Sequence, residues 1–199
     1  MTIVRCAALV FLITVLGHGQ SAQERHQIDS SSHAEFPVRR LYQQLMSRPT
    51  GGIPTPKRMR LFAPYLSSSL LHSITQARAC GDDWFRQRPQ NNVKAPLEWL
   101  EFGLFSGAND RTGLHTFQIE KFESKDDGSF RAYVKLTGGI PPEKPRTWRV
   151  AAVVISENKH FVISDVIYLR DNDIDTETRL SNILTRGCNG SHWVGYTNQ

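Results

Sequence analysis

Asp165 is the residue in this chain best suited to acid–base chemistry, because it lies within the apolar run of residues 161–169. Burial raises the pKa of a carboxyl group, and a buried carboxyl can act as a general base or acid. A tyrosine hydroxyl could donate to the same substrate, and the candidates are Tyr42, Tyr65 and Tyr168. The competing and more common interpretation is a structural aspartate, exposed near the strand end or paired with an arginine.

His115 is a second, weaker candidate base, on the same face of a predicted strand as Phe117 and Ile119. A lone histidine on an apolar face is more often a satisfied core residue than a base or a metal ligand. His160 and His192 have no cysteine, histidine or carboxylate at metal-ligand spacing. The sequence also contains no nucleophile elbow, phosphate loop or zinc-protease signature. We therefore expect no cofactor and no metal, and the pattern leans away from an enzyme.

The N-terminus has the pattern of a secretory signal peptide. Arg5 supplies a positive charge, residues 6–16 are apolar apart from one threonine, and small residues follow. The apolar run is shorter than the roughly 20 residues that a membrane-spanning helix needs. We expect a signal peptide over residues 1–19, cleaved after Gly19 or after Ala22, and hence a periplasmic or secreted protein without a membrane span.

Cysteine usage fits an oxidising compartment. An exported chain would lose Cys6 with its leader and keep Cys80 and Cys188. An even number of cysteines in an exported chain suggests a disulfide. Each of the two lies beside a glycine at the predicted end of a helix, where the chain can turn toward a partner. We predict a Cys80–Cys188 disulfide, and two separate buried thiols are the alternative.

The elements that would position these side chains change type halfway along the chain. Residues 20–35 are polar and predict a flexible arm, and one domain follows over residues 36–199. Apolar residues at helical spacing predict that residues 36–80 are mainly helical, with the third helix ending at Cys80. Period-two alternation then predicts a four-stranded antiparallel sheet over residues 114–169, and a closing helix around residues 175–186.

Two local signals add detail to the predicted sheet. Phe122 falls out of step with the preceding alternation, which indicates a bulge near residues 120–121. Asp127-Gly128 is a hairpin-turn signal. The last two predicted strands are apolar on both faces, so we expect them to be central in the sheet or covered on both sides.

Helices followed by an antiparallel meander predict the α+β class. The first helix can cross the concave face of a curved sheet and enclose a cavity, which is a natural place for a ligand. The residues that we expect to line this pocket are Leu41, Tyr42, Leu45, Trp99 and Tyr168. The net charge is only +5 and the basic residues are scattered, which argues against a nucleic-acid partner.

Several segments carry a resemblance to a known family: residues 38–45, Leu61-Phe62-Ala63-Pro64-Tyr65-Leu66-Ser67, residues 163–168 and residues 180–184. Their order resembles a bacterial exported family of unknown function with the nuclear transport factor 2-like (cystatin-like) cone fold, over roughly residues 36–187. The resemblance implies a cone of helices on a curved sheet, and it implies no substrate and no catalytic residue. Because this fold hosts isomerases, dehydratases and plain binding modules, it does not decide the function.

We therefore expect a non-catalytic binding or interaction module for an unknown small ligand or envelope protein. The first alternative is a small cone-fold isomerase, dehydratase or hydrolase that uses Asp165 with a tyrosine or histidine. A further alternative is an inhibitor or immunity-type protein. The position of Asp165 discriminates between these hypotheses, because a cavity beside a tyrosine or histidine favours the enzyme, whereas an arginine partner favours the binding module.

Overall fold

Helices precede a five-stranded sheet in this chain. The computed structural model describes residues 22–47, 51–88, 94–100, 103–108, 113–140, 142, 144–170 and 173–196, of which residues 22–31, 98, 170 and 173–177 are described by their backbone alone. The predicted leader over residues 1–19 lies outside these residues. None of the described helices is long and apolar enough to cross a membrane.

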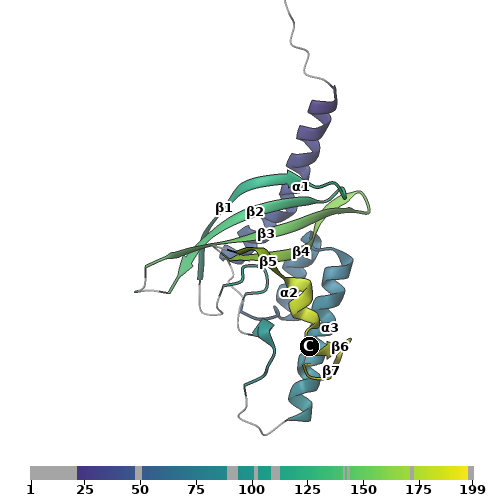
Figure 1. Ribbon diagram of the computed structural model, residues 1–199, viewed down its shortest axis with the longest axis vertical. Coiled ribbons are helices and arrows are strands. Elements are labelled where there is room, and N and C mark those ends of the chain that lie inside the picture. Colours follow the sequence, from purple (N-terminus) through teal and green to yellow (C-terminus); the bar gives the residue numbers. More distant parts are fainter. Residues whose placement is uncertain are drawn as a thin grey trace, which may run out of the picture.

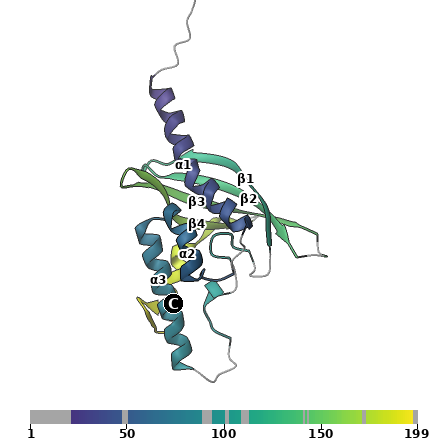
Figure 2. The same ribbon diagram turned by 180° about the vertical axis from the view of Figure 1, so that it is seen from behind.

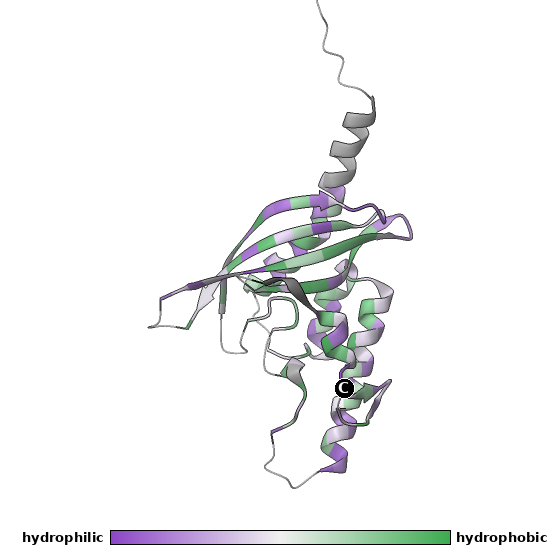
Figure 3. Cartoon of the chain, in the orientation of Figure 1, coloured by the Kyte–Doolittle hydropathy of each residue, from purple (hydrophilic) through white to green (hydrophobic). Residues whose placement is uncertain are grey.

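The sheet is antiparallel throughout, and its strand order follows the sequence. Its strands are β1 (Gly113–Ser124), β2 (Phe130–Gly139), β3 (Arg146–Glu157), β4 (His160–Arg170) and β5 (Asp173–Arg179) (Figure 1). Alternate residues of β2 are buried, because successive side chains of a strand point to opposite faces. Ala132, Val134 and Leu136 therefore face the core, and the strands carry alternating hydropathy (Figure 3).

Helix α1 (Ala22–Ser47) packs across the inner face of the sheet and extends past its edge (Figures 1 and 2). Ala34, Val38 and Leu41 are fully buried at helical spacing. The prediction of a flexible arm over residues 20–35 is therefore wrong from Ala22 onward, because that part of the chain is helical. We had expected ordered structure to begin at about residue 36. Here Pro37 lies inside the helix.

Two further helices follow, as predicted. Helix α2 (Pro56–Phe62) begins at Thr55, whose hydroxyl caps its first turn, and a short 3₁₀ helix, η1 (Ala63–Tyr65), follows. Helix α3 (Ser68–Gln87) is capped by Ser67, and it continues past Cys80 where we predicted its end. The glycine after Cys80 faces a neighbour instead of ending the helix: a Cβ on Gly81 would lie 2.5 Å from the ring of Trp99.

The C-terminal part of the chain differs from the prediction. Residues expected to begin the closing helix form β5, which pairs with β4 and makes the sheet five-stranded rather than four-stranded. The helix itself is short, α4 (Leu180–Thr185). A small hairpin follows, with β6 (Cys188–Asn189) and β7 (His192–Trp193), and a second 3₁₀ helix, η2 (Glu98–Leu100), lies in the central connection. The mixed α+β class is confirmed.

The two local signals in the sheet are confirmed. The register between β1 and β2 shifts between Ile119 and Lys121, which is the predicted bulge. In the hairpin turn, Gly128 has a φ of +78°. Asp127 accepts a hydrogen bond of 2.9 Å from the backbone N–H of Ser129 there.

Candidate functional site

Asp165 lies on β4 with only 8% of its surface exposed, and its carboxylate is engaged on several sides. It accepts hydrogen bonds from the backbone N–H and the hydroxyl of Ser181, at 3.1 and 2.8 Å. It also accepts from the backbone N–H of Val166 at 2.8 Å, and the guanidinium of Arg179 lies 3.7 Å away. Asp165 is therefore held by an arginine and by the first turn of a helix.

The position of Asp165 has a structural cause. Arg179 is the N-cap residue of α4, and its side chain makes no capping hydrogen bond. The first turn of a helix has unsatisfied N–H groups and carries partial positive charge, so a carboxylate there is stabilising. Asp165 supplies this acceptor from the neighbouring strand, since β4 and β5 pair just before α4 begins. Sequence periodicity placed Asp165 in a buried strand but did not identify Ser181 as its partner.

Three aromatic side chains converge on the inner turn, which we define as residues 103–108. The Tyr42 hydroxyl of α1 donates to the carbonyl of Phe105 at 2.9 Å, and the indole N–H of Trp148 on β3 donates to the carbonyl of Ser106 at 2.7 Å. The Tyr168 hydroxyl of β4 donates to the carbonyl of Leu104. Three consecutive backbone carbonyls are thus each bound by a donor from a different element.

The inner turn is also closed on itself and buried. Gly103 donates its N–H to the carbonyl of Ala108 at 2.7 Å, and Gly107 donates back to Gly103 at 2.8 Å. Gly107 has a φ of +66°, and a Cβ there would lie 2.7 Å from the Tyr168 ring, so glycine is required. Leu104 and Phe105 are fully buried. The turn therefore packs against α1 and the inner face of the sheet.

The residues predicted to line a pocket are core residues in this structure. Leu41 and Tyr42 have no exposed surface, and Leu45 and Trp99 are each 4% exposed. Tyr168 is half-buried, with its hydroxyl bound to the inner turn. Tyr42, which has no exposed surface and whose hydroxyl binds the inner turn, is closed to a ligand in this arrangement. The two glycines of this turn, Gly103 and Gly107, are its only local signals in the sequence.

Burial also defines the chemistry of these two tyrosines. Removal from water disfavours the charged phenolate, and this raises the pKa of Tyr42 and of Tyr168 well above the ordinary value. Repulsion from nearby Asp165 adds to the effect at Tyr168. Both hydroxyls therefore stay protonated and act as hydrogen-bond donors.

His115 does not join Asp165. The register between β1 and β2 shifts between Leu114 and Thr116, so His115 lies in a second bulge that the sequence did not indicate. Its side chain is exposed instead of facing the core with Phe117, as we had expected. Within the described residues, no group of three or more histidines, cysteines and carboxylates could hold a metal ion.

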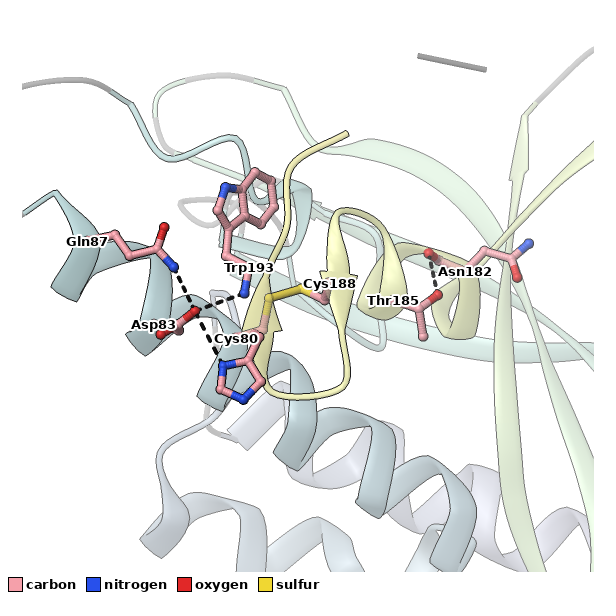
Figure 4. The surroundings of a disulfide bond; sticks show 8 residues. Cys80, Asp83, Gln87, Asn182, Thr185, Cys188 and Trp193 are labelled. Atoms are coloured by element: carbon pink, nitrogen blue, oxygen red, sulfur yellow. Dashed lines mark hydrogen bonds and ion pairs between the residues drawn. A yellow bond between two sulfur atoms is a disulfide. The ribbon is translucent and has the colours of Figure 1, made fainter. Parts of the chain in front are cut away.

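Cys80 and Cys188 meet as predicted, with their sulfur atoms 2.04 Å apart and their α-carbons 6.1 Å apart (Figure 4). The bond joins the middle of α3 to β6. One helical turn after Cys80, Asp83 accepts hydrogen bonds from the backbone N–H of Trp193 at 3.0 Å and from Gln87 at 2.9 Å (Figure 4). The bond from Trp193, with the nearby charge of Arg86, keeps the pKa of Asp83 below its usual value. The predicted end of the third helix at Cys80 left Asp83 outside it, so this anchor was missed.

Comparisons with known proteins identify no family for this chain. No family model matches it, and no curated protein matches it. A crystal structure of a protein of unknown function from Bacteroides thetaiotaomicron VPI-5482 is similar at 11% identity and a TM-score of 0.35. The match covers 72% of this chain and 92% of that protein.

Proposed function

We propose that this protein is an exported, non-catalytic interaction module that binds its partner through its surface. The observation that carries the proposal is the engagement of Asp165, Tyr42 and Tyr168, three of the candidate acid–base groups. Asp165 is bound to Ser181 and Arg179, and the hydroxyls of Tyr42 and Tyr168 are bound to the inner turn. A catalytic base needs a free lone pair that faces a substrate.

The energetic cost of opening the interior supports a surface function. Moving the inner turn aside would expose Leu104 and Phe105, each fully buried, at about 1.5–3 kcal/mol per side chain. It would also break three side-chain hydrogen bonds, each worth roughly 1 kcal/mol. The free energy of opening is therefore about 5–10 kcal/mol. At this cost, about one molecule in several thousand, or fewer, is in an open form.

The proposed site of action is the periplasm or the exterior. The Arg5-led apolar segment supports export, and the Cys80–Cys188 pair fits an oxidising compartment. The proposed architecture is the cone of the nuclear transport factor 2-like folds. Its support is the passage of α1 across the inner face of an antiparallel sheet.

Crosslinking in intact cells of the native host, with the full chain under its own leader, tests the proposal. We expect a discrete adduct with another protein, and we expect Asp165→Asn to retain it. The matched enzymatic assay incubates the purified protein with a small-molecule extract of the host envelope and follows depletion by mass spectrometry. Depletion of a compound by the wild-type protein but not by Asp165→Asn would overturn the proposal.

An inhibitor or immunity-type role is a second candidate within the same kind of function. It is favoured by the short hairpin after α4, which the disulfide fixes to α3. Inhibitors often present a segment of this kind to the surface of their target, because a pre-ordered segment loses little entropy on binding.

A further inference from the structure

Acidic residues are distributed unevenly along this chain. Seven of its 24 Lys and Arg residues fall within residues 36–81, and none of its 19 Asp and Glu residues does. This stretch comprises the second half of α1, all of α2 and η1, and most of α3. Because the formal net charge of the whole chain is only +5, the rest of the chain holds more acidic than basic residues. The excess positive charge therefore belongs to the helices and not to the sheet.

Five of these cations lie on two neighbouring helices. We define the basic face as the exposed side chains on α1 and α2 of Arg39, Arg40, Lys57, Arg58 and Arg60. The two helices contact each other (Figure 2). Lys57 and Arg60 are three positions apart and thus neighbours on the surface of α2, while Phe62 of the same helix is buried. The basic face is therefore built on the solvent side of helices whose other side packs into the core.

The protein neutralises only part of this charge. Arg39 forms an ion pair with Glu35, one turn earlier on α1. A second carboxylate, that of Glu157, contacts the same stretch of chain, but it accepts from the backbone N–H of Ser68 at 3.2 Å. The basic side chains that form no ion pair with a described residue are Arg40, Lys57 and Arg60. Their charges are available to a partner.

An exposed aromatic ring adjoins the basic face. Phe36 on α1 is 53% exposed. The guanidinium of Arg40 lies over this ring, 5.3 Å from its centroid, and the ring of Tyr65 meets it edge-on at 6.4 Å. The contact with Tyr65 also places this part of α1 beside η1, the segment that directly follows α2. An apolar ring is thus presented together with cations.

Beyond the interaction function proposed above, we propose that the basic face attaches this protein reversibly to an anionic membrane surface, where phosphate-bearing lipid headgroups occupy it. Each Lys or Arg near such a surface strengthens attachment by about fivefold. Attachment to a lipid surface takes two signals, and the ring of Phe36 supplies the second by entering the boundary between headgroups and acyl chains. A protein exported as proposed meets this surface in the membrane that it crosses.

A lipid surface suits the basic face better than an acidic protein does. Headgroups move within the membrane and can gather around cations that stand on two helices, so no matched arrangement of carboxylates is needed. The acidic balance of the rest of the chain also favours one orientation, with α1 and α2 toward the anionic surface. The protein would lie on the membrane without crossing it.

Co-sedimentation of the mature protein with lipid vesicles tests this attachment. The vesicles contain either phosphatidylcholine alone or phosphatidylcholine with anionic phosphatidylglycerol. We expect binding to the anionic vesicles and not to the neutral ones. Raising the salt from about 0.05 to 0.3 M should weaken the binding, because the charges are screened. Equal binding to both kinds of vesicle, or no binding to either, would overturn the proposal.

Two pairs of charge reversals identify the surface that binds. Lys57→Glu/Arg60→Glu should weaken binding to the anionic vesicles at least about tenfold. The control pair Lys144→Glu/Lys159→Glu changes the net charge equally at exposed positions in the connections between strands, and should weaken binding less than about threefold. All four residues are exposed, so both variants should unfold at the same urea concentration as the wild type. Equal weakening by the two pairs would show that net charge alone acts, and would overturn the proposal.

The aromatic contribution is measured with a matched pair of apolar residues. Phe36→Ser should weaken binding at least about threefold, because the ring no longer enters the membrane. Ile140→Ser removes a side chain that is 39% exposed on the strand side of the molecule and should leave binding unchanged. Unchanged binding for Phe36→Ser would overturn the role of the ring.

A further outcome separates the membrane attachment from the proposed interaction function. If the wild type does not bind vesicles, while a protein adduct in intact cells requires Lys57 and Arg60, the basic face binds an acidic protein. The membrane attachment would then be overturned and the interaction module would stand. Failure of the interaction function would instead appear as depletion of a small molecule that requires Asp165, with vesicle binding intact.

Discussion

Asp165 joins β4 to the first turn of α4, because its carboxylate accepts from both polar groups of Ser181 and lies beside Arg179. A buried carboxylate that satisfies helix N–H groups contributes to stability. The residue type and its burial could be inferred from the sequence. Its role depends on a helix that begins 15 positions later, and no spacing rule links the two.

The replacement Asp165→Asn should lower the free energy of unfolding by about 1–3 kcal/mol, because an NH2 group replaces one of the two oxygens that accept from Ser181 and the charge beside Arg179 is lost. Urea unfolding at neutral pH measures this. Asp126→Asn, in an exposed turn, is the matched control and should change stability by less than about 0.5 kcal/mol. Equal stability of the two variants would contradict the structural role.

Tyr42 and Tyr168 should make the fold sensitive to alkali. Their pKa values are raised in the folded protein by burial, so the folded state holds protons that the unfolded state releases above about pH 10. Stability is therefore complete below about pH 10 and should fall as pH rises beyond it. Ultraviolet difference spectroscopy should show that two of the five tyrosines ionise only as the protein unfolds. Ionisation of all five in the folded protein would contradict this account.

At the scale of elements, periodicity predicted most of the architecture. The three N-terminal helices and the first four strands follow the expected order, since their apolar residues repeat at one clear period. The predictions were wrong where contacts between residues far apart in the sequence determine the structure. Helix α3 continues through Gly81 because Trp99 packs there, and β5 forms because its backbone pairs with β4. Neither partner is visible in the local pattern.

The inner turn and the hairpin anchor could not be predicted for a similar reason. Tyr42 and Phe105 are 63 positions apart, and Asp83 and Trp193 are 110 positions apart. The sequence identified Tyr42, Tyr168, Cys80 and Cys188 by residue type. Only the folded chain shows that two of these side chains bind a turn of the same protein.

Gly187 should be essential for the attachment of the small hairpin of β6 and β7 to the rest of the protein. It has a φ of +74°, and a Cβ there would overlap the Trp193 ring. Gly195 is the matched control, since its φ is +86° and a Cβ there would meet nothing within 4 Å. In both alanine variants the left-handed backbone conformation should lower the free energy of unfolding by about 1–2 kcal/mol. Gly187→Ala should lower it by about 1–3 kcal/mol more, because the new methyl group overpacks against the Trp193 ring. Thermal unfolding followed by tryptophan fluorescence compares them, and equal losses would contradict the packing.

At the scale of the whole molecule, the core of the described residues is packed around the inner turn. The inner turn lies against the side chains that we expected to line a pocket, and the core continues through α1, α3, α4 and the sheet. Such a structure favours recognition through exposed segments. The disulfide ties the small hairpin of β6 and β7 to α3, which fits the proposed interaction module and an oxidising compartment.

Hydrogen exchange of the inner turn tests this account most directly. The backbone N–H groups of Gly103, Ser106 and Gly107 donate within the turn. If the turn is a permanent part of the core, these amides should exchange as slowly as those of β3, which open only when the whole protein unfolds. If they exchange as fast as the exposed hairpin turn at residues 125–129, the inner turn opens readily. The interior would then be accessible to a ligand, and the surface-binding account would be contradicted.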